Sequence, residues 1–321
     1  MRAWFGLLMC AAGAAASAGA CAQAYPAKPM RLIVGFAAGS TTDLIGRVIA
    51  QKMSEGLGQT VIMENRPGAG SNIAYELVSK APPDGYTLLI ANAGIATGAT
   101  AYVKLNFNAL RDFAPVSQVS ATPHIVVVHP SLPVKSMKEL TAFAKARPGQ
   151  LNFASTGHGN SDHMATALYL FMTGLDMVHV TYKGGPQAAG DILTGQIAVY
   201  FGGMPVGLPL AKAGKLRALA VTSAKRSSAA PDLPTMDEAG ITGYEHTLWG
   251  MLMVPAATPK DIGARLHREA ARAVESADVR DRLANMGVDT VGTTPEQANA
   301  YLRSEIAKYA KVVKAIGLRI E

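Results

Sequence analysis

The sequence predicts an α/β fold with two lobes, each built from a mixed sheet flanked by helices. Strand-like and helix-like segments alternate twice along the chain, first over residues 30–91 and again from about residue 122. Such alternation is typical of βαβ units with parallel strands. The 321 residues are 49% hydrophobic and 17% charged, which suits one large or two medium globular domains and excludes a disordered or fibrous chain.

The first unit contains three expected strands with a helix after each of the first two. The expected strands are 30–36, 60–64 and 86–91, and the expected helices are 43–57 and a second one that ends near residue 80. Leu44, Val48 and Met53 follow the helical period. Gly56 and Gly58 mark the end of that helix.

The second unit repeats the pattern and is followed by a buried strand and two helices. We expect strands at 125–128, 151–154, 178–182, 197–201, 216–222 and 246–254, and helices at 136–146 and 162–173. Two helices close the chain, each with a threonine cap and a proline at its first helical position, at Thr258–Pro259 and at Thr294–Pro295. Gln297 completes a capping box in the second of these.

Extended segments near residues 118–123 and 243–254 divide the chain into the two lobes. We expect lobe 1 to comprise residues 25–121 plus 246–321, and lobe 2 to comprise residues 122–245. The return of the chain to lobe 1 is inferred because the closing helices need a sheet to cover. A ligand is expected in the cleft between the lobes.

Residues 1–24 have the features of a secretory signal peptide. Arg2 precedes an apolar run at 4–16 that is too short to span a bilayer, and 22–24 form a small-x-small cleavage site. Cleavage after Ala24 places the mature chain in the periplasm. An uncleaved membrane anchor and a lipoprotein attached through Cys21 are the less favoured alternatives. Cys10 and Cys21 are the only cysteines, so a mature chain from Tyr25 excludes a disulfide framework and cysteine chemistry.

The charge balance is moderately basic, with 30 basic and 23 acidic residues giving +7. Removal of the leader subtracts Arg2 and no acid, so the mature balance is 29 minus 23, or +6. The basic residues are scattered and interleaved with acids, whereas nucleic-acid binding requires a clustered stripe. We therefore expect no nucleic-acid partner.

The loop at residues 37–42 follows a strand and opens a helix. A helix start presents up to four unpaired N–H groups and about half a positive charge, which favours an anion. Ser40, Thr41 and Thr42 add hydroxyl groups, and Gly39 lets a ligand approach the backbone. The alternative interpretation is an ordinary βα connection in which Thr42 or Asp43 caps the helix.

The second unit has a loop of the same kind at residues 155–161. It follows the strand 151–154 and precedes the helix that carries His163. If both loops face one cleft, they can bind two ends of a carboxylate-bearing molecule. His163 itself has the alternative role of a structural hydrogen-bonding residue.

Catalytic and cofactor motifs are absent from the sequence. It contains no G-x-S-x-G, no H-E-x-x-H and no Walker lysine after Gly39. The spacing of His158 and His163 across a loop-to-helix boundary is poor for two zinc ligands on one helical face. We therefore expect no metal, no dinucleotide and no other cofactor.

Ordered motifs along the whole mature chain resemble the Bug or TctC-type receptors, extracytoplasmic solute-binding proteins of tripartite tricarboxylate transporters. The matching segments are Tyr25-Pro26, Gly39 to Arg47, Glu64 to Gly70, Pro83 to Leu88, Ser155 to His163, Tyr182-Lys183-Gly184, Leu233 to Gly240 and Trp249 to Pro259. The resemblance implies a two-lobed periplasmic-binding-protein fold of the type II kind. It also implies a monomer without enzymatic activity or cofactor that closes around a small organic carboxylate and delivers it to membrane transporter subunits.

The resemblance also implies a set of ligand-binding residues in the two loops. They are Phe36, Gly39, Ser40, Thr41, Thr42 and Asp43 in one loop, Ser155, Thr156, Gly157, His158, Gly159, Asn160, Ser161 and His163 in the other, and Asn92 and Tyr182 on the cleft wall.

Serines stand at two positions where this family commonly has glycine, Ser40 and Ser71. The identity of the ligand therefore does not carry over from relatives, whereas the ligand class does. Two other functions stay open. One is a secreted α/β serine hydrolase that uses Ser155 or Ser161 with His158 or His163, and the other is a ligand-sensing partner of a membrane sensor.

Overall fold

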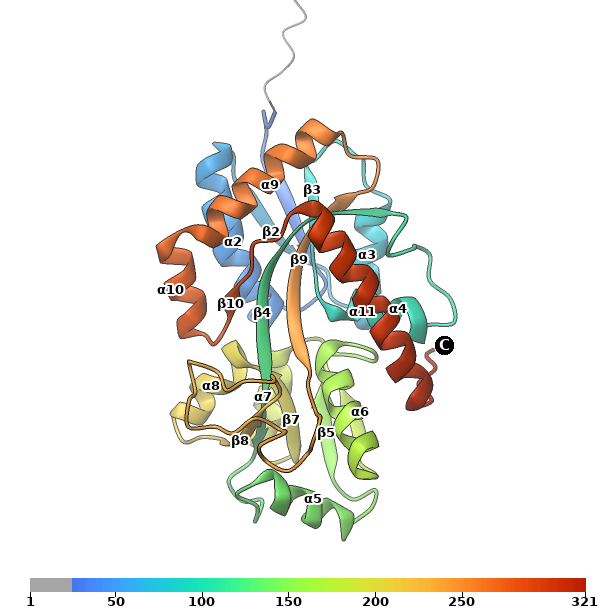
Figure 1. Ribbon diagram of the computed structural model, residues 1–321, viewed down its shortest axis with the longest axis vertical. Helices are drawn as coiled ribbons and strands as arrows, with labels where there is room; N and C mark the ends of the chain where they lie inside the picture. The colour runs from blue at the N-terminus through green and yellow to red at the C-terminus, as the bar shows by residue number, and fades with distance from the viewer. Residues whose placement is uncertain (1–24) are drawn as a thin grey trace, which may run out of the picture.

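The computed structural model describes residues 25–321, which form an elongated molecule of two lobes stacked along the long axis (Figure 1). The expected signal peptide, its cleavage after Ala24 and the lipoprotein alternative at Cys21 lie outside the described residues. Within residues 25–321 we find no helix that is long and apolar enough to cross a membrane.

Lobe 1, the upper lobe in Figure 1, is a sheet covered by helices on both faces. Its elements are β1 (Met30–Val34), α2 (Thr41–Leu57), β2 (Val61–Asn65), the 3-10 turn η2 (Ala69–Ser71), α3 (Asn72–Ser79), β3 (Thr87–Ala91), α4 (Ala93–Ala101), α9 (Lys260–Glu275), α10 (Ala277–Asn285), β10 (Asp289–Thr290) and α11 (Pro295–Ala315).

Lobe 2, the lower lobe, repeats this architecture. Its elements are α5 (Met137–Lys145), β5 (Asn152–Ser155), α6 (Ser161–Thr173), β6 (Val178–Thr181), α7 (Gly185–Leu193), β7 (Val199–Gly203), α8 (Met204–Lys212) and β8 (Arg217–Val221). Two long strands, β4 (Phe113–Val128) and β9 (Thr247–Pro255), connect the lobes (Figure 1).

The strand order explains how the lobes are joined. In lobe 1, β1 pairs in parallel with β2 and β3, and β9 lies antiparallel between β3 and β4. The end of β4 then leaves β9 and pairs antiparallel with β7 and β8, while β5 pairs in parallel with β6 and β7. Each lobe therefore has a mixed sheet, and β4 is a member of both.

Period-2 alternation in the strands produces a separate core on each face of each sheet. In β1, Leu32 packs with α2, α9 and α10, whereas Ile33 packs on the other face with α3, α4 and α11. In β4, Val126 belongs to the core beside α5 and α6, and Val127 to the core beside α7 and α8. Successive strand residues point to opposite faces, so both sheets are buried on both sides.

Several expected elements differ from the observed ones. Helices α4, α7 and α8 were not predicted, because glycine and proline within them mask the helical pattern; α7, for example, reads GPQAAGDIL. Three helices, not two, follow β9. Helix α9 begins at Lys260, one residue after Pro259, so that proline does not occupy the first helical position. The capping box at Thr294 and Gln297 is present as expected.

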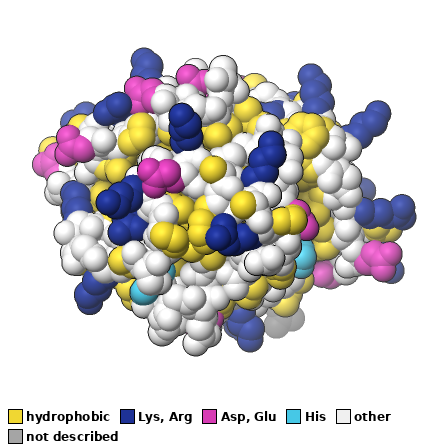
Figure 2. Space-filling model, turned by 90° about the horizontal axis from the view of Figure 1, so that it is seen from below, with side chains coloured by type: hydrophobic (Ala, Val, Ile, Leu, Met, Phe, Trp, Pro, Cys, Tyr) yellow, Lys and Arg dark blue, Asp and Glu magenta, His cyan; other side chains and the backbone are white. Residues whose placement is uncertain are grey.

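Basic side chains are dispersed over the face of the molecule shown in Figure 2. Lysine and arginine side chains lie singly there, among acidic and hydrophobic ones. Many of the described cations also contact acids, such as Arg31 with Glu64 and Arg226 with Glu238. This face therefore carries no continuous basic stripe.

Candidate ligand-binding cleft

The start of α2 is held in place by one buried carboxylate. Asp43 accepts hydrogen bonds from the Gly39 backbone N–H (2.8 Å), the Arg47 Nε (2.9 Å) and the Asn65 Nδ2 (2.8 Å). The N-cap residue is Ser40, not Thr42 or Asp43, and the Ser40 side chain makes no capping hydrogen bond to the helix. Asp43 therefore shapes the loop, and its oxygens are occupied by protein donors.

The start of α6 has the same design. Asp162 accepts the Thr156 backbone N–H (2.8 Å) and the Thr156 hydroxyl (3.0 Å), and this fixes the loop that precedes the helix. Asn160 is the N-cap residue. The Ser161 hydroxyl lies 2.8 Å from Nε2 of His124, a buried residue of β4 at the crossing between the lobes.

Both helix starts line one small cavity between the lobes, which we call the inner cavity. Its volume is about 30 Å³, which is room for about one or two water molecules. Its lining residues are Phe36, Ser40, Thr41, Thr42, Asn92, His124, Thr156, Ser161, Asp162, Gly185, Tyr200, Gly203 and Leu248. A larger ligand can enter only if the lobes separate.

Five helices begin at the inner cavity, not two. Besides α2 and α6, helix α4 begins after its cap Asn92, α7 begins at Gly185, and α8 begins after Gly203. Among the described residues that line the cavity, none is lysine or arginine. The one acid in this lining, Asp162, has its oxygens occupied by Thr156 donors. Helix dipoles and backbone N–H groups at the five helix starts favour a carboxylate or another anion.

Two buried side-chain atoms at the inner cavity have hydrogen-bonding capacity to spare. Within residues 25–321, the Ser40 Oγ and the His124 Nδ1 are buried and have no hydrogen-bond partner. Burial lowers the pKa of His124 to about 4, so its imidazole is neutral near pH 7. Both groups are suited to hydrogen-bond a ligand in the cavity.

A second, larger space lies beside the inner cavity and shares Thr156 with it; we call it the neighbouring pocket. It has a volume of about 650 Å³ and contains the only described cleft-lining lysine, Lys183. Its lining residues are Gly35, Gly68, Ala69, Gly70, Ser71, Tyr102, Thr156, Gly157, His158, Thr181, Tyr182, Lys183, Gln187, Ile320 and Glu321.

The structure divides the expected site residues into three groups. Phe36, Ser40, Thr41, Thr42, Asn92, Thr156 and Ser161 line the inner cavity, and Gly157, His158 and Tyr182 line the neighbouring pocket. Gly39, Asp43, Ser155, Gly159, Asn160 and His163 line neither space. Gly39 and Gly159 lie at contacts with the opposite lobe, where an added Cβ would be 3.3 Å from Pro186 and from Ile320, respectively.

Six lining residues of the inner cavity were not expected from the sequence: His124, Asp162, Gly185, Tyr200, Gly203 and Leu248. Gly203 and Gly185 each begin a helix that was itself unpredicted, so no pattern identified them. His124 and Leu248 come from the two crossing strands. The position of His124, a polar residue immediately before the apolar run 125–128, was the one indication in the sequence.

Glycines lie at places where the two lobes are in close contact. An added Cβ on Gly203 would lie 2.1 Å from the Thr41 Oγ1, and one on Gly184 would lie 2.8 Å from the Ala37 Cβ. The Ala37 backbone N–H donates to the Lys183 carbonyl oxygen at 3.2 Å. The lobes are therefore closed on each other, with backbone against side chain across the cleft.

The Asp162 carboxyl should contribute a loss of stability as the pH rises from about 4 to 6, opposite in sign to the gain contributed by buried, neutral histidines such as His124. Burial raises the pKa of this carboxyl from 3.8 to about 6. Between these values the folded protein binds more protons than the unfolded chain, so raising the pH costs up to about 3 kcal/mol, and the effect levels off above pH 6.

Urea unfolding of wild type and Asp162→Asn at several pH values from 4 to 7 measures this contribution. The stability of wild type relative to the variant should fall by up to about 3 kcal/mol between pH 4 and 6, because the variant's amide does not titrate and its oxygen still accepts the Thr156 N–H. Asp281→Asn, a change at an exposed position of α10, is the control. Equal slopes in wild type and Asp162→Asn would contradict the prediction.

Comparison with known proteins identifies the family of the chain. Residues 45–318 match the family model for the tripartite tricarboxylate transporter family receptor. Protein BugT of Bordetella pertussis is 36% identical over 318 residues, covering 98% of this chain and 97% of that protein.

Solved structures give the same result. The R. palustris protein Rpa4515 with adipate is 35% identical with a TM-score of 0.89, covering 92% of this chain and 99% of that one. MatC from Rhodopseudomonas palustris with bound malate is 29% identical with a TM-score of 0.85, covering 90% of this chain and 100% of that one.

The fold and its cleft define a two-lobed periplasmic binding protein, which is a solute receptor and not an enzyme. The chain belongs to the tripartite tricarboxylate transporter receptor family, which includes the Bug proteins. The hydrolase alternative is excluded by the family to which the chain belongs. Its expected serine–histidine pairs are also not formed, because Ser155 contacts His179 and Ser161 contacts His124.

Proposed function

We propose that this protein captures a small organic carboxylate in the periplasm and delivers it to a membrane transporter of the tripartite tricarboxylate type. The observation that carries the proposal is the convergence of five helix starts on a cavity whose described lining has no lysine or arginine. Backbone N–H groups at such starts bind anionic oxygens. The adipate and malate in the structures of the relatives Rpa4515 and MatC are ligands of this class.

The ligand binds between lobe 1 (residues 25–121 plus 246–321) and lobe 2 (residues 122–245). Thr41 and Ser161 bind its carboxylate oxygens from opposite lobes, with Ser40 and His124 as further contacts. The lobes open to admit the acid and close by hinge motion in the crossing strands. The neighbouring pocket, with Lys183, accommodates the remainder of a longer acid.

The protein acts as a monomer after removal of residues 1–24. Use of the closed form by a membrane sensor involves the same binding site and differs only in the partner. The sequence matches a transporter receptor family, which favours transport.

Thermal unfolding in the presence of individual acids tests the proposal. Adipate, malate, citrate, glutamate and benzoate are added in turn at matched ionic strength. A ligand present at 100 times its Kd should add about 2.7 kcal/mol of stability. A raised melting temperature with at least one acid supports the proposal, and no shift with any carboxylate overturns it.

Variants of the two helix starts test the assigned contacts. Thr41→Leu and Ser161→Leu should each abolish the ligand-induced shift, because each places an apolar side chain where a carboxylate oxygen binds. Ser304→Leu, on the exposed face of α11, is the matched control and should bind normally. Wild-type affinity in both cleft variants would refute the assignment.

A further inference from the structure

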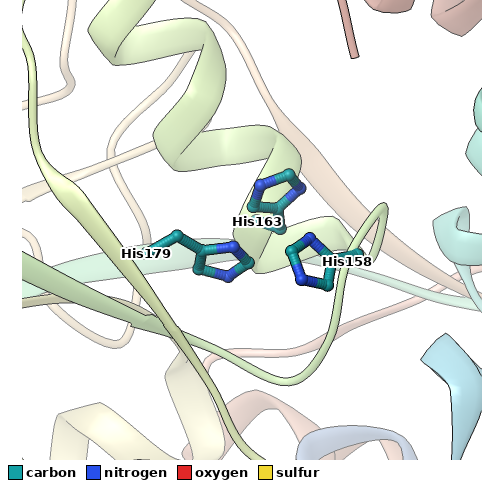
Figure 3. Close-up of side chains that lie close together, drawn as sticks. All are labelled: His158, His163 and His179. Carbon is teal, nitrogen blue, oxygen red and sulfur yellow. The ribbon is translucent and has the colours of Figure 1, made fainter. Parts of the chain in front are cut away.

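Three histidines from separate elements of lobe 2 lie together beside the cleft. His158 belongs to the loop before α6, His163 to the first turn of α6, and His179 to β6 (Figure 3). One ring nitrogen of each lies within 4.8 Å of those of the other two. The rings of His163 and His179 are stacked with centroids 4.2 Å apart, and His158 meets His179 edge-on at 4.7 Å.

The local structure restrains two of these rings more than the third. His179 stacks on Phe153 with centroids 4.8 Å apart, and its Nε2 lies 2.5 Å from the Ser155 hydroxyl. His163 is buried. His158 is exposed, so its ring is free to rotate while the hydrogen bonds of Thr156 and Gly159 hold the backbone of the loop.

The two inner histidines are neutral under ordinary conditions. Burial and the neighbouring imidazoles lower the pKa of His163 to about 3 and that of His179 to about 4. Neutral imidazole is the form that ligates metals, so no proton has to be displaced from these rings near pH 7.

We propose that His158, His163 and His179 form a binding site for a divalent transition metal of the zinc type. Three imidazole ligands and one open position is an arrangement that Zn²⁺ adopts in proteins. Tetrahedral coordination needs ligand nitrogens about 3.4 Å apart. The rings must therefore approach from their present spacing, and rotation of the exposed His158 ring together with smaller rotations of the two stacked rings provides that movement. The site does not depend on the proposed function.

Metal binding at this cluster changes the loop before α6. The His163 Nδ1 now accepts the Gly159 backbone N–H at 3.1 Å. If Nδ1 ligates the metal, this hydrogen bond is displaced. If Nε2 ligates it, neutral His163 carries its proton on Nδ1, which then faces another donor. In either case the Gly159 N–H loses its partner, so the metal alters the loop that contributes Thr156 and Ser161 to the cleft.

Calorimetric titration of tag-free, metal-stripped protein with ZnCl₂, without any carboxylate, tests the site. We expect one tightly bound Zn²⁺ per chain. His158→Ala and His179→Ala should each weaken binding by roughly tenfold or more. His158 is exposed, so its variant should fold even if that of His179 does not. His129→Ala, outside the cluster, should bind as wild type does.

Nuclear magnetic resonance gives a second measurement that an unrelated surface site would not affect. The Gly159 amide should shift and exchange faster with solvent when Zn²⁺ is added. An unchanged Gly159 amide, no Zn²⁺ binding, or equal affinity in wild type and His158→Ala would each overturn the proposal. Loss of carboxylate binding would leave it untouched, since no acid is present.

Discussion

Replacing Gly203 by alanine should weaken carboxylate binding about 5- to 150-fold while leaving each lobe folded. The added Cβ would lie 2.1 Å from the Thr41 Oγ1 and 2.9 Å from its Cβ, well inside van der Waals contact. Thr41 begins α2 in lobe 1 and Gly203 precedes α8 in lobe 2, so the overlap arises only when the lobes are closed. Overpacking of this kind costs about 1–3 kcal/mol, which converts to the stated range.

The same substitution is harmless to the backbone of lobe 2. Gly203 has φ −64° and ψ 144°, a conformation that alanine adopts freely. The melting temperature without ligand should therefore change little, and the loss should appear in ligand affinity and in ligand-induced compaction measured by small-angle X-ray scattering.

Gly190→Ala is the matched control for this experiment. Gly190 lies in α7 of the same lobe, and an added Cβ there would meet nothing within 4 Å. Its affinity should equal that of wild type. If Gly203→Ala also binds as tightly as wild type, closure of the lobes onto Thr41 is not required for binding.

The sequence predicted the parts of the fold that have strong periodic patterns. The strand and the helix within residues 30–57 and the capping box at Thr294 follow directly from residue spacing and are observed. Helices α4, α7 and α8 were missed, because glycine and proline have low intrinsic helix propensity and tertiary packing overrides that preference here.

Only those residues of the candidate site that belong to a local sequence pattern could be predicted from the sequence. Thr41 and Ser161 stand out because hydroxyl-bearing residues begin strongly patterned helices. His124 in β4 and Gly203 in β7 are 79 positions apart in the sequence, and only the pairing of these two strands brings them together at the cavity. Long-range pairing of this kind leaves no trace in local spacing. The pairing of β5 with β6 likewise brings His179 to His158 and His163. The spacing of His158 and His163 alone did not indicate this third histidine.

Replacing Asp43 by alanine should destabilise the protein by about 3–5 kcal/mol and abolish carboxylate binding. Its buried carboxylate accepts hydrogen bonds from Gly39, Arg47 and Asn65, and alanine removes all three. Each buried donor left without an acceptor, such as the Gly39 N–H and the Asn65 amide, costs about 1–3 kcal/mol, whereas the half-exposed Arg47 returns to water. The Gly39 N–H would lose its acceptor, so the loop that places Ser40 and Thr41 at the inner cavity would lose its fixed shape.

Arg47→Ala separates the role of the loop from that of the ion pair. The Arg47 side chain is 49% exposed, so its removal should cost at most about 1 kcal/mol and spare binding. Asp43→Asn should be intermediate, because its amide oxygen can still accept from Gly39 while its NH₂ group faces the donors of Asn65 or Arg47. Urea unfolding measures the change in stability of each variant, and the thermal shift produced by an added carboxylate ligand measures the change in binding. If Arg47→Ala is as damaging as Asp43→Ala, the ion pair and not the loop geometry organises this helix start.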